Sequence, residues 1–146
     1  MSDWEVEVVV PGAPIGKGRP RGTAAGGYVK LYTPKRTADW ERAAALLARN
    51  LWHRAPLEGE IEVEVDAVFP RPKRLLRKKD PEGRMWHISK PDIDNVVKSS
   101  LDMAVMAGLM RDDSQVVKLS ARSLYASKSE GPSLVFRMRL MESLPG

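Results

Sequence analysis

Four stretches of the chain alternate apolar and polar residues, which is the pattern of a half-buried β-strand. We expect these strands at residues 4–10, 61–69, 117–125 and 134–140. A turn at residues 128–132 separates the last two, so we expect them to form a hairpin. A further short strand or hairpin arm is expected at residues 28–32. Within the second strand, Glu62, Glu64 and Asp66 share one side, which we interpret as a solvated face.

Two other segments place apolar residues three and four positions apart, as amphipathic helices do. The first starts at Thr33-Pro34 or Thr37 and ends near His53, with a stripe expected in the core: Trp40, Ala44, Leu47 and Leu51. The second runs from Asp92 to about Gly108. The order β-α-β-α-β-β predicts one mixed α/β (α+β) domain over residues 1–146, with a sheet of about four strands and helices packed on it.

Two segments rich in glycine, proline and basic residues interrupt this pattern, at residues 11–27 and 70–90. A long segment without regular structure in a compact domain is usually functional or disordered. The chain carries a net charge of +5, and many of its cations gather in these loops, which is typical of a polyanion-binding surface. The candidate nucleic-acid contacts are Lys17, Arg19, Arg21, Arg71, Lys73, Arg74, Arg77, Lys78, Lys79 and Lys90. The alternative for both segments is a solvated loop, and Trp86 fits a core anchor better than a base-stacking residue.

Composition excludes several classes of site. The chain has no cysteine, which excludes disulfides, zinc-thiolate sites and a thiol nucleophile. Two histidines are too few for a histidine-rich metal site. No apolar run approaches the ~20 residues that cross a bilayer, and no signal peptide precedes Trp4. We therefore expect a cytoplasmic protein without a membrane partner.

The stretch from Lys90 to Lys98 concentrates the polar chemistry. Pro91 brings the chain in extended, Asp92 stands at the N-cap position of the second helix, and Asp94 and Lys98 share a helix face. Close carboxylates repel one another unless a cation neutralises them, and such oxygen ligands suit Mg²⁺. A calcium loop of the EF-hand type is excluded, because valines stand where a ligand and a glycine are required. The structural alternative is an N-cap beside an ordinary surface ion pair.

The sequence Lys90-Pro91-Asp92-Ile93-Asp94-Asn95-x-x-Lys98, with the pair Asp112-Asp113 further on, resembles the signature of RusA-type Holliday junction resolvases. The basic stretch at residues 17–21 and Tyr32-Thr33-Pro34 resemble phage and prophage members of that family. The likeness covers residues 8–125, although the basic segment at 70–90 is longer than in compact members.

The resemblance implies a homodimer that cleaves four-way DNA junctions with Mg²⁺, for which Mn²⁺ is a substitute. The residues that match the family's essential acids, and so the implied metal ligands, are Asp92, Asp94 and Asp113; Lys98 matches its important lysine. The role of Asp112 stays open, and Asp102 is a possible ion-pair partner of Lys98. Carboxylate-held Mg²⁺ suits phosphodiester hydrolysis, and Lys98 is placed to stabilise the transition state. A two-fold dimer matches a junction's approximate two-fold symmetry.

Two alternatives from other classes remain open at this point. One is a different Mg²⁺-dependent nuclease that acts on flaps or duplex ends. The other is a non-catalytic basic DNA-binding protein in which the acids serve only as helix caps. Comparing cleavage of a junction with cleavage of linear DNA separates the two nucleases, and comparing DNA cleavage with and without Mg²⁺ distinguishes the non-catalytic protein.

Overall fold

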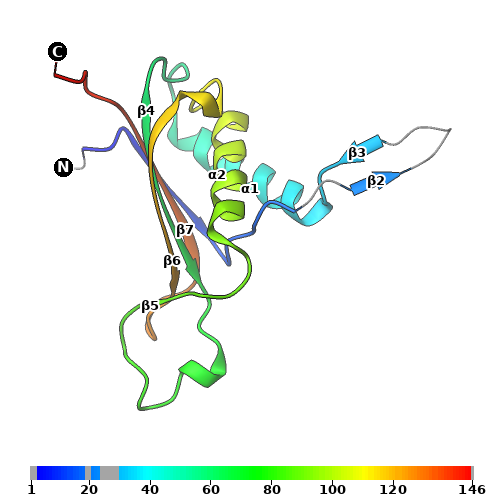
Figure 1. The fold of residues 1–146 in the computed structure, drawn as a ribbon, viewed down its shortest axis with the longest axis vertical. Helices are drawn as coiled ribbons and strands as arrows, with labels where there is room; N and C mark the ends of the chain where they lie inside the picture. The colour runs from blue at the N-terminus through cyan, green and yellow to red at the C-terminus, as the bar shows by residue number, and fades with distance from the viewer. Residues whose placement is uncertain (1–2, 19–20, 24–29, 146) are drawn as a thin grey trace.

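The computed structural model describes residues 3–18, 21–23 and 30–145 of the chain (Figure 1). Five strands form one mixed sheet in the order β1-β7-β4-β6-β5, and β2 and β3 form a separate hairpin. The elements are β1 (Val6–Pro11), β2 (Arg21–Thr23), β3 (Lys30–Tyr32), α1 (Lys35–Leu51), β4 (Ile61–Phe69), the 3₁₀ turn η2 (Lys73–Leu75), β5 (Met85–Trp86), α2 (Ile93–Met106), the 3₁₀ turn η3 (Asp113–Gln115), β6 (Val116–Tyr125) and β7 (Ser133–Leu140). The predicted mixed α/β class is confirmed, with one strand more than expected in the main sheet.

The strand β4 lies at the centre of the sheet, parallel to β6 on one side and antiparallel to β7 on the other. β7 also pairs with β1 at the sheet's edge. The predicted hairpin between the last two strands is therefore wrong, because β4 lies between β6 and β7. The helix α2 forms the crossover that returns the chain parallel to β4, a connection that parallel strands require.

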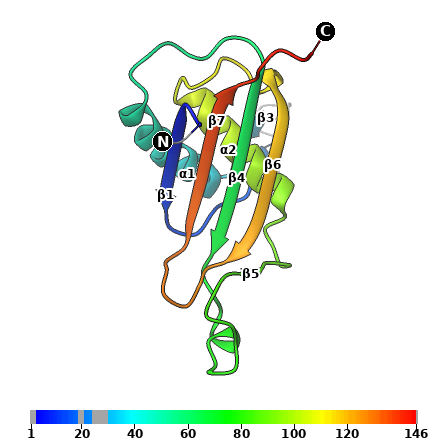
Figure 2. The ribbon, with the colours of Figure 1, turned by 90° about the vertical axis from the view of Figure 1, so that its left-hand side faces the viewer.

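Both helices cover one face of the sheet, where they enclose the hydrophobic core (Figure 2). The side of α1 that faces the core carries Thr37, Glu41, Ala44, Ala45 and Ala48. The predicted stripe is wrong at its C-terminal end, where the side chains of Leu47 and Leu51 are 40% and 56% exposed. Three small alanines let α1 pack closely against α2, and this contact determines which side of the helix is buried.

The opposite face of the sheet carries acids and arginines that pair across the strands. Arg139 bonds Glu62 at 2.8 Å, and Arg122 bonds Asp66 at 2.8 Å. Arg137 bridges Glu64 at 2.7 Å and Asp66 at 3.3 Å. The prediction of a solvated acidic face is therefore wrong for Glu62 and Asp66, which are only 7% and 2% exposed. The Arg122 guanidinium, outweighing the effect of burial, holds the pKa of Asp66 below its ordinary value.

The basic loop of residues 70–90 extends beyond the end of the sheet (Figure 1). Arg71 organises it by donating to the carbonyl oxygens of Ala126 at 3.0 Å and Leu75 at 3.2 Å, and also to those of Pro81 and Gly83. The loop contains η2 and β5, so it is more regular than its composition indicated. Trp86 in β5 is 68% exposed, which makes the expected core anchor wrong.

The hairpin of β2 and β3 projects from the body beside the start of α1 (Figure 1). The hairpin arm expected at residues 28–32 is confirmed for residues 30–32, whereas β2 appears where an irregular loop was expected. None of the helices within the described residues is long and apolar enough to cross a membrane.

Candidate active site

Asp92 occupies the N-cap position of α2, as predicted, but its carboxylate accepts no capping hydrogen bond. The carboxylate instead binds the Lys90 ammonium at 2.8 Å across the cis peptide bond Lys90–Pro91. Since an N-cap aspartate ordinarily accepts a bond from the helix backbone, capping does not explain this residue. The Asp92 carboxylate is half exposed at 50% and faces solvent at the end of the helix.

Asp94 and Lys98 lie on the exposed side of α2, one turn apart. Neither forms an ion pair with any residue that the structure describes, so the expected surface pair between them is not formed. Asp102, the alternative partner for Lys98, binds Lys17 at 2.7 Å instead. Asp94 and Lys98 therefore present an unpaired carboxylate and an unpaired ammonium beside Asp92.

Asp112 and Asp113 differ in role, although they are adjacent. Asp112 caps η3 by accepting a bond from the Ser114 amide at 3.0 Å, and Gln115 completes a capping box. Asp113 is exposed and lies near Asp102 and Asp112. Proximity to Asp112, with burial and the charge of Asp102 adding to it, raises the pKa of Asp113. The cap accounts for the first acid of the pair and leaves the second available for a ligand.

The three predicted metal ligands are not brought together within one chain. Asp92 and Asp94 lie at the N-terminal end of α2, whereas Asp113 shares a hollow with Val105 and Met106 at its C-terminal end. At 1.5 Å per residue, the separation from Asp94 to Val105 and Met106 is roughly 17 Å along the helix. Accordingly, no group of three or more acidic or histidine side chains among the described residues is close enough to hold a metal ion.

The segment around Lys17 packs against α2 and contacts it through hydrogen bonds and an ion pair. The Lys17 amide donates to the Asn95 carbonyl at 2.8 Å, and its ammonium bonds Asp102 at 2.7 Å and Glu41 at 3.2 Å. Burial opposes the charged form, but these two acids outweigh it and raise the pKa of Lys17. A Cβ at Gly16 would lie 2.7 Å from Cβ of Pro91, so only glycine permits this approach. Lys17 thus positions the site, a role that the sequence did not reveal.

The remaining basic candidates fall into two groups. Arg71 is committed to backbone carbonyls of its own loop, and Arg77 lies 3.5 Å from Asp80. Four exposed cations of the same loop form no ion pair with any residue that the structure describes: Lys73, Arg74, Lys78 and Lys79. Of the earlier candidates, Arg19 lies outside the described residues, and for Arg21 the structure describes only the backbone.

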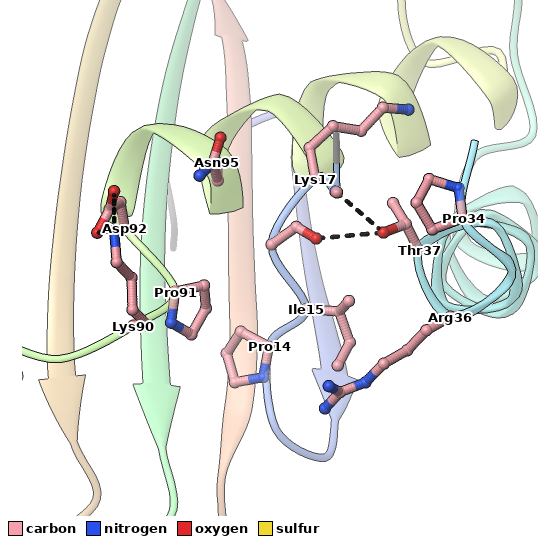
Figure 3. Close-up of a pocket in the computed structure, with 12 residues that line it drawn as sticks. Pro14, Ile15, Lys17, Pro34, Arg36, Thr37, Lys90, Pro91, Asp92 and Asn95 are labelled. Carbon is pink, nitrogen blue, oxygen red and sulfur yellow. Dashed lines mark hydrogen bonds and ion pairs between the residues drawn. The ribbon is translucent and has the colours of Figure 1, made fainter. Parts of the chain in front are cut away.

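Two hollows adjoin Asp92. One, of about 750 Å³, lies between residues 86–93 and residues 121–123 of β6. His87 anchors its wall by stacking on Phe69, and the ring nitrogen Nδ1 lies 2.8 Å from Oγ of Ser123. The other, of about 730 Å³, lies between Pro91, residues 14–18 and the start of α1 (Figure 3). Asp92 therefore faces open space on both sides.

The sequence of the chain is similar to one protein family and to two known proteins. A family model described as Endodeoxyribonuclease RusA matches residues 11–132. The uncharacterised protein YqaN of Bacillus subtilis (strain 168) is 30% identical over 128 residues, which cover 84% of this chain and 89% of YqaN. The crossover junction endodeoxyribonuclease RusA of Aquifex aeolicus (strain VF5) is 23% identical over 139 residues, which cover 95% of this chain and 94% of that protein.

Proposed function

This chain belongs to the RusA endodeoxyribonuclease family, and we propose that it resolves four-way DNA junctions by paired, Mg²⁺-dependent cuts as a homodimer. The protein is an endodeoxyribonuclease by that membership. The relative from Aquifex aeolicus is named for crossover junctions, which supports the junction as substrate. The observation that carries the proposal is the exposure of Asp92, Asp94 and Lys98 together over the first two turns of α2.

The chemistry of the acids fits a hard divalent cation. Asp92 is not used as a cap, Asp94 has no ion-pair partner among the described residues, and Asp113 is left free by the capping of Asp112. Carboxylate oxygens are the ligands that Mg²⁺ and Mn²⁺ prefer. Bound there, the ion supplies Lewis acidity and an activated water for phosphodiester hydrolysis.

Within one chain these acids are too far apart to share an ion, which binds oxygen at about 2.1 Å. We therefore propose that two copies complete the site, Asp113 of one subunit joining Asp92 and Asp94 of the other. A two-fold axis would then generate two equivalent sites from one type of contact. Two identical sites match the paired cuts that junction resolution needs.

An open strand edge favours this assembly. β5 pairs only with Leu124 and Tyr125, so most of β6 lacks a neighbour on that side among the described strands. Val117 and Leu119 on this strand are 59% and 47% exposed. An unpaired edge with exposed apolar residues is a template for pairing with a second chain. Antiparallel pairing of two β6 strands would bring η3, just before β6, toward the partner's hollow beside Asp92.

Lys98 has a distinct role in this proposal. It lies one helical turn from Asp94 and is not bound to any acid that the structure describes. A free ammonium beside the scissile phosphate can stabilise the charge that develops on the phosphoryl oxygens. This role differs from phosphate binding, which we assign to the unpaired cations of the basic loop, Lys73, Arg74, Lys78 and Lys79. Lys17 and Arg71 are left out of that set because their cationic groups are occupied.

A cleavage comparison tests the proposal. The protein is incubated with a four-way junction, a flap and a linear duplex, in Mg²⁺ or in chelator. We expect Mg²⁺-dependent cleavage of the junction, and we expect Asp92→Asn to abolish it while binding persists or tightens, since one negative charge near DNA is removed. Asp39→Asn is the control, because Asp39 forms an ordinary surface pair with Lys35 on α1. Preferential cutting of flaps or duplex ends would replace the junction assignment, and full activity of Asp92→Asn would refute the site.

A further inference from the structure

The hollow between Pro91 and the start of α1 has walls of a particular chemistry (Figure 3). Pro14 and Pro91 stand on one side of it, and Pro34 stands on the other, with Ile15 between them. Three flat, rigid proline rings and a branched aliphatic side chain present apolar surface to an open space of about 730 Å³. Such surfaces suit a planar, partly apolar group better than they suit a bare phosphate.

Polar groups converge on the same space. Arg36 extends into it from the first turn of α1, whereas Lys90 at the opposite rim is paired with Asp92 (Figure 3). The side-chain amide of Asn95 also lines it, and no residue that the structure describes forms a hydrogen bond with that amide. An amide can donate and accept at once, which lets it bond the edge of a nucleobase. The hollow thus combines apolar walls, one cation without an ion pair among the described residues, Arg36, and an unused amide.

The hollow also adjoins the proposed chemistry directly, because Asp92 is one of its lining residues. We propose that it receives the unstacked nucleotide next to the scissile phosphate, with the base between the proline rings and Arg36 on its phosphate. This inference rests on the proposed function and names the part of the substrate that this hollow binds. Asn95 is then the residue that reads the edge of the base and determines sequence preference.

A junction makes this occupant physically accessible. Extruding a base costs least where stacking or pairing is already disturbed, as at the point where strands exchange. An intact duplex offers only stacked bases, whose apolar faces cannot reach the proline rings. The hollow would therefore distinguish a distorted junction from linear DNA, while the basic loop binds both through their backbones.

The test places 2-aminopurine, a base whose fluorescence rises on unstacking, next to the scissile phosphate or several nucleotides away. Full-length protein carrying Asp113→Asn is used, because this change is expected to block cleavage and lies outside the hollow. We expect binding to raise fluorescence at the flanking position alone. Adding Arg36→Ala should suppress the rise and lower the log–log salt slope of binding by about 0.9, as expected when one phosphate is no longer neutralised. Arg42→Ala, further along α1 and paired with Asp39, should change neither.

A second measurement concerns Asn95. Parental cleavage rates should differ among four junctions that vary only at the flanking base, and Asn95→Ala should narrow those differences. Tight junction binding without a fluorescence rise would overturn the inference and leave junction cleavage intact. A rise that persists in Arg36→Ala would show that the base unstacks elsewhere. A protein that neither binds nor cuts junctions would overturn both this inference and the proposed function.

Discussion

The proposed sharing of each site between two subunits can be tested by mixing inactive variants. Asp94→Asn and Asp113→Asn each remove one carboxylate charge and retain the size of the side chain. In a homodimer of either variant, both sites lack one acid, so we expect neither to cleave. In a mixed dimer with shared sites, one site receives both substitutions and the other receives none.

The expected recovery follows from pairing statistics. Random assortment of equal amounts makes half of the dimers mixed, and each has one intact site of two, so roughly a quarter of the sites regain function. The structure gives the reason for this expectation, since Asp94 lies in the first turn of α2 and Asp113 lies beside its C-terminal end, roughly 17 Å away along the helix. Cleavage of a plasmid with an extruded cruciform distinguishes one active site from two, because one cut yields a nicked circle and two opposed cuts yield a linear molecule.

The matched control mixes Asp92→Asn with Asp94→Asn. Both acids lie at the same end of α2, so every site in the mixed dimer lacks one of them, and no recovery is expected. For the Asp94 and Asp113 pair, nicked circles should accumulate with little linear product. If that mixture stays as inactive as its components after verified subunit exchange, the acids belong to one chain's site and the shared arrangement is refuted.

Three further outcomes are expected. The Lys98→Ala variant should bind junctions normally but cut ~10²–10³ times more slowly in single-turnover assays, because the ammonium no longer stabilises the transition state. A nearly parental rate would show that Lys98 is a solvated surface residue without a role in cleavage. The second change replaces four loop cations by alanine: Lys73, Arg74, Lys78 and Lys79. It should lower the log–log salt slope of junction binding by ~0.9 for each phosphate that the loop no longer neutralises, and an unchanged slope would place the loop away from DNA. Arg84, with the Ser127 amide, holds the pKa of Glu130 at about 2, below its ordinary 4.5. The stability from these interactions is complete above about pH 4.5 and disappears as pH falls toward 2. The melting temperature of Glu130→Gln should therefore fall less over that range than the melting temperature of the parent, and the same dependence on pH in both proteins would contradict this.

The sequence predicted where the strands and helices lie along the chain better than it predicted which strands pair in the sheet. The alternation of apolar and polar residues located β4 and β7 well, because this alternation marks a strand from its own residues alone. It could not show that β4 separates β6 from β7, since pairing depends on the path of the α2 crossover. The buried state of Asp66 was missed for a similar reason: the arginines that cover it come from β6 and β7, over fifty residues away in sequence.

For related reasons, the sequence predicted the positions of only some of the candidate site residues. The motif correctly placed Asp92 at the N-cap of α2, because proline and the apolar helix pattern mark that position locally. The distance along the sequence from the motif to Asp113 did not predict where Asp113 lies in space, since its place depends on the length of α2 and on the turn that follows it. Lys17 was interpreted as a phosphate contact because its loop is basic, whereas its acidic partners Glu41 and Asp102 become visible only after folding.

The paired charges on the open face of the sheet also influence how the protein meets DNA. Because Arg122, Arg137 and Arg139 are each matched by carboxylates, that face contributes little to the protein's excess positive charge. The excess instead resides on the loop beyond the sheet, whose exposed cations lie close in sequence to the proposed catalytic stretch. We therefore expect a diffusing junction to experience an asymmetric field that turns the proposed active end toward it before contact. Such steering accelerates association at low ionic strength and fades as salt screens it.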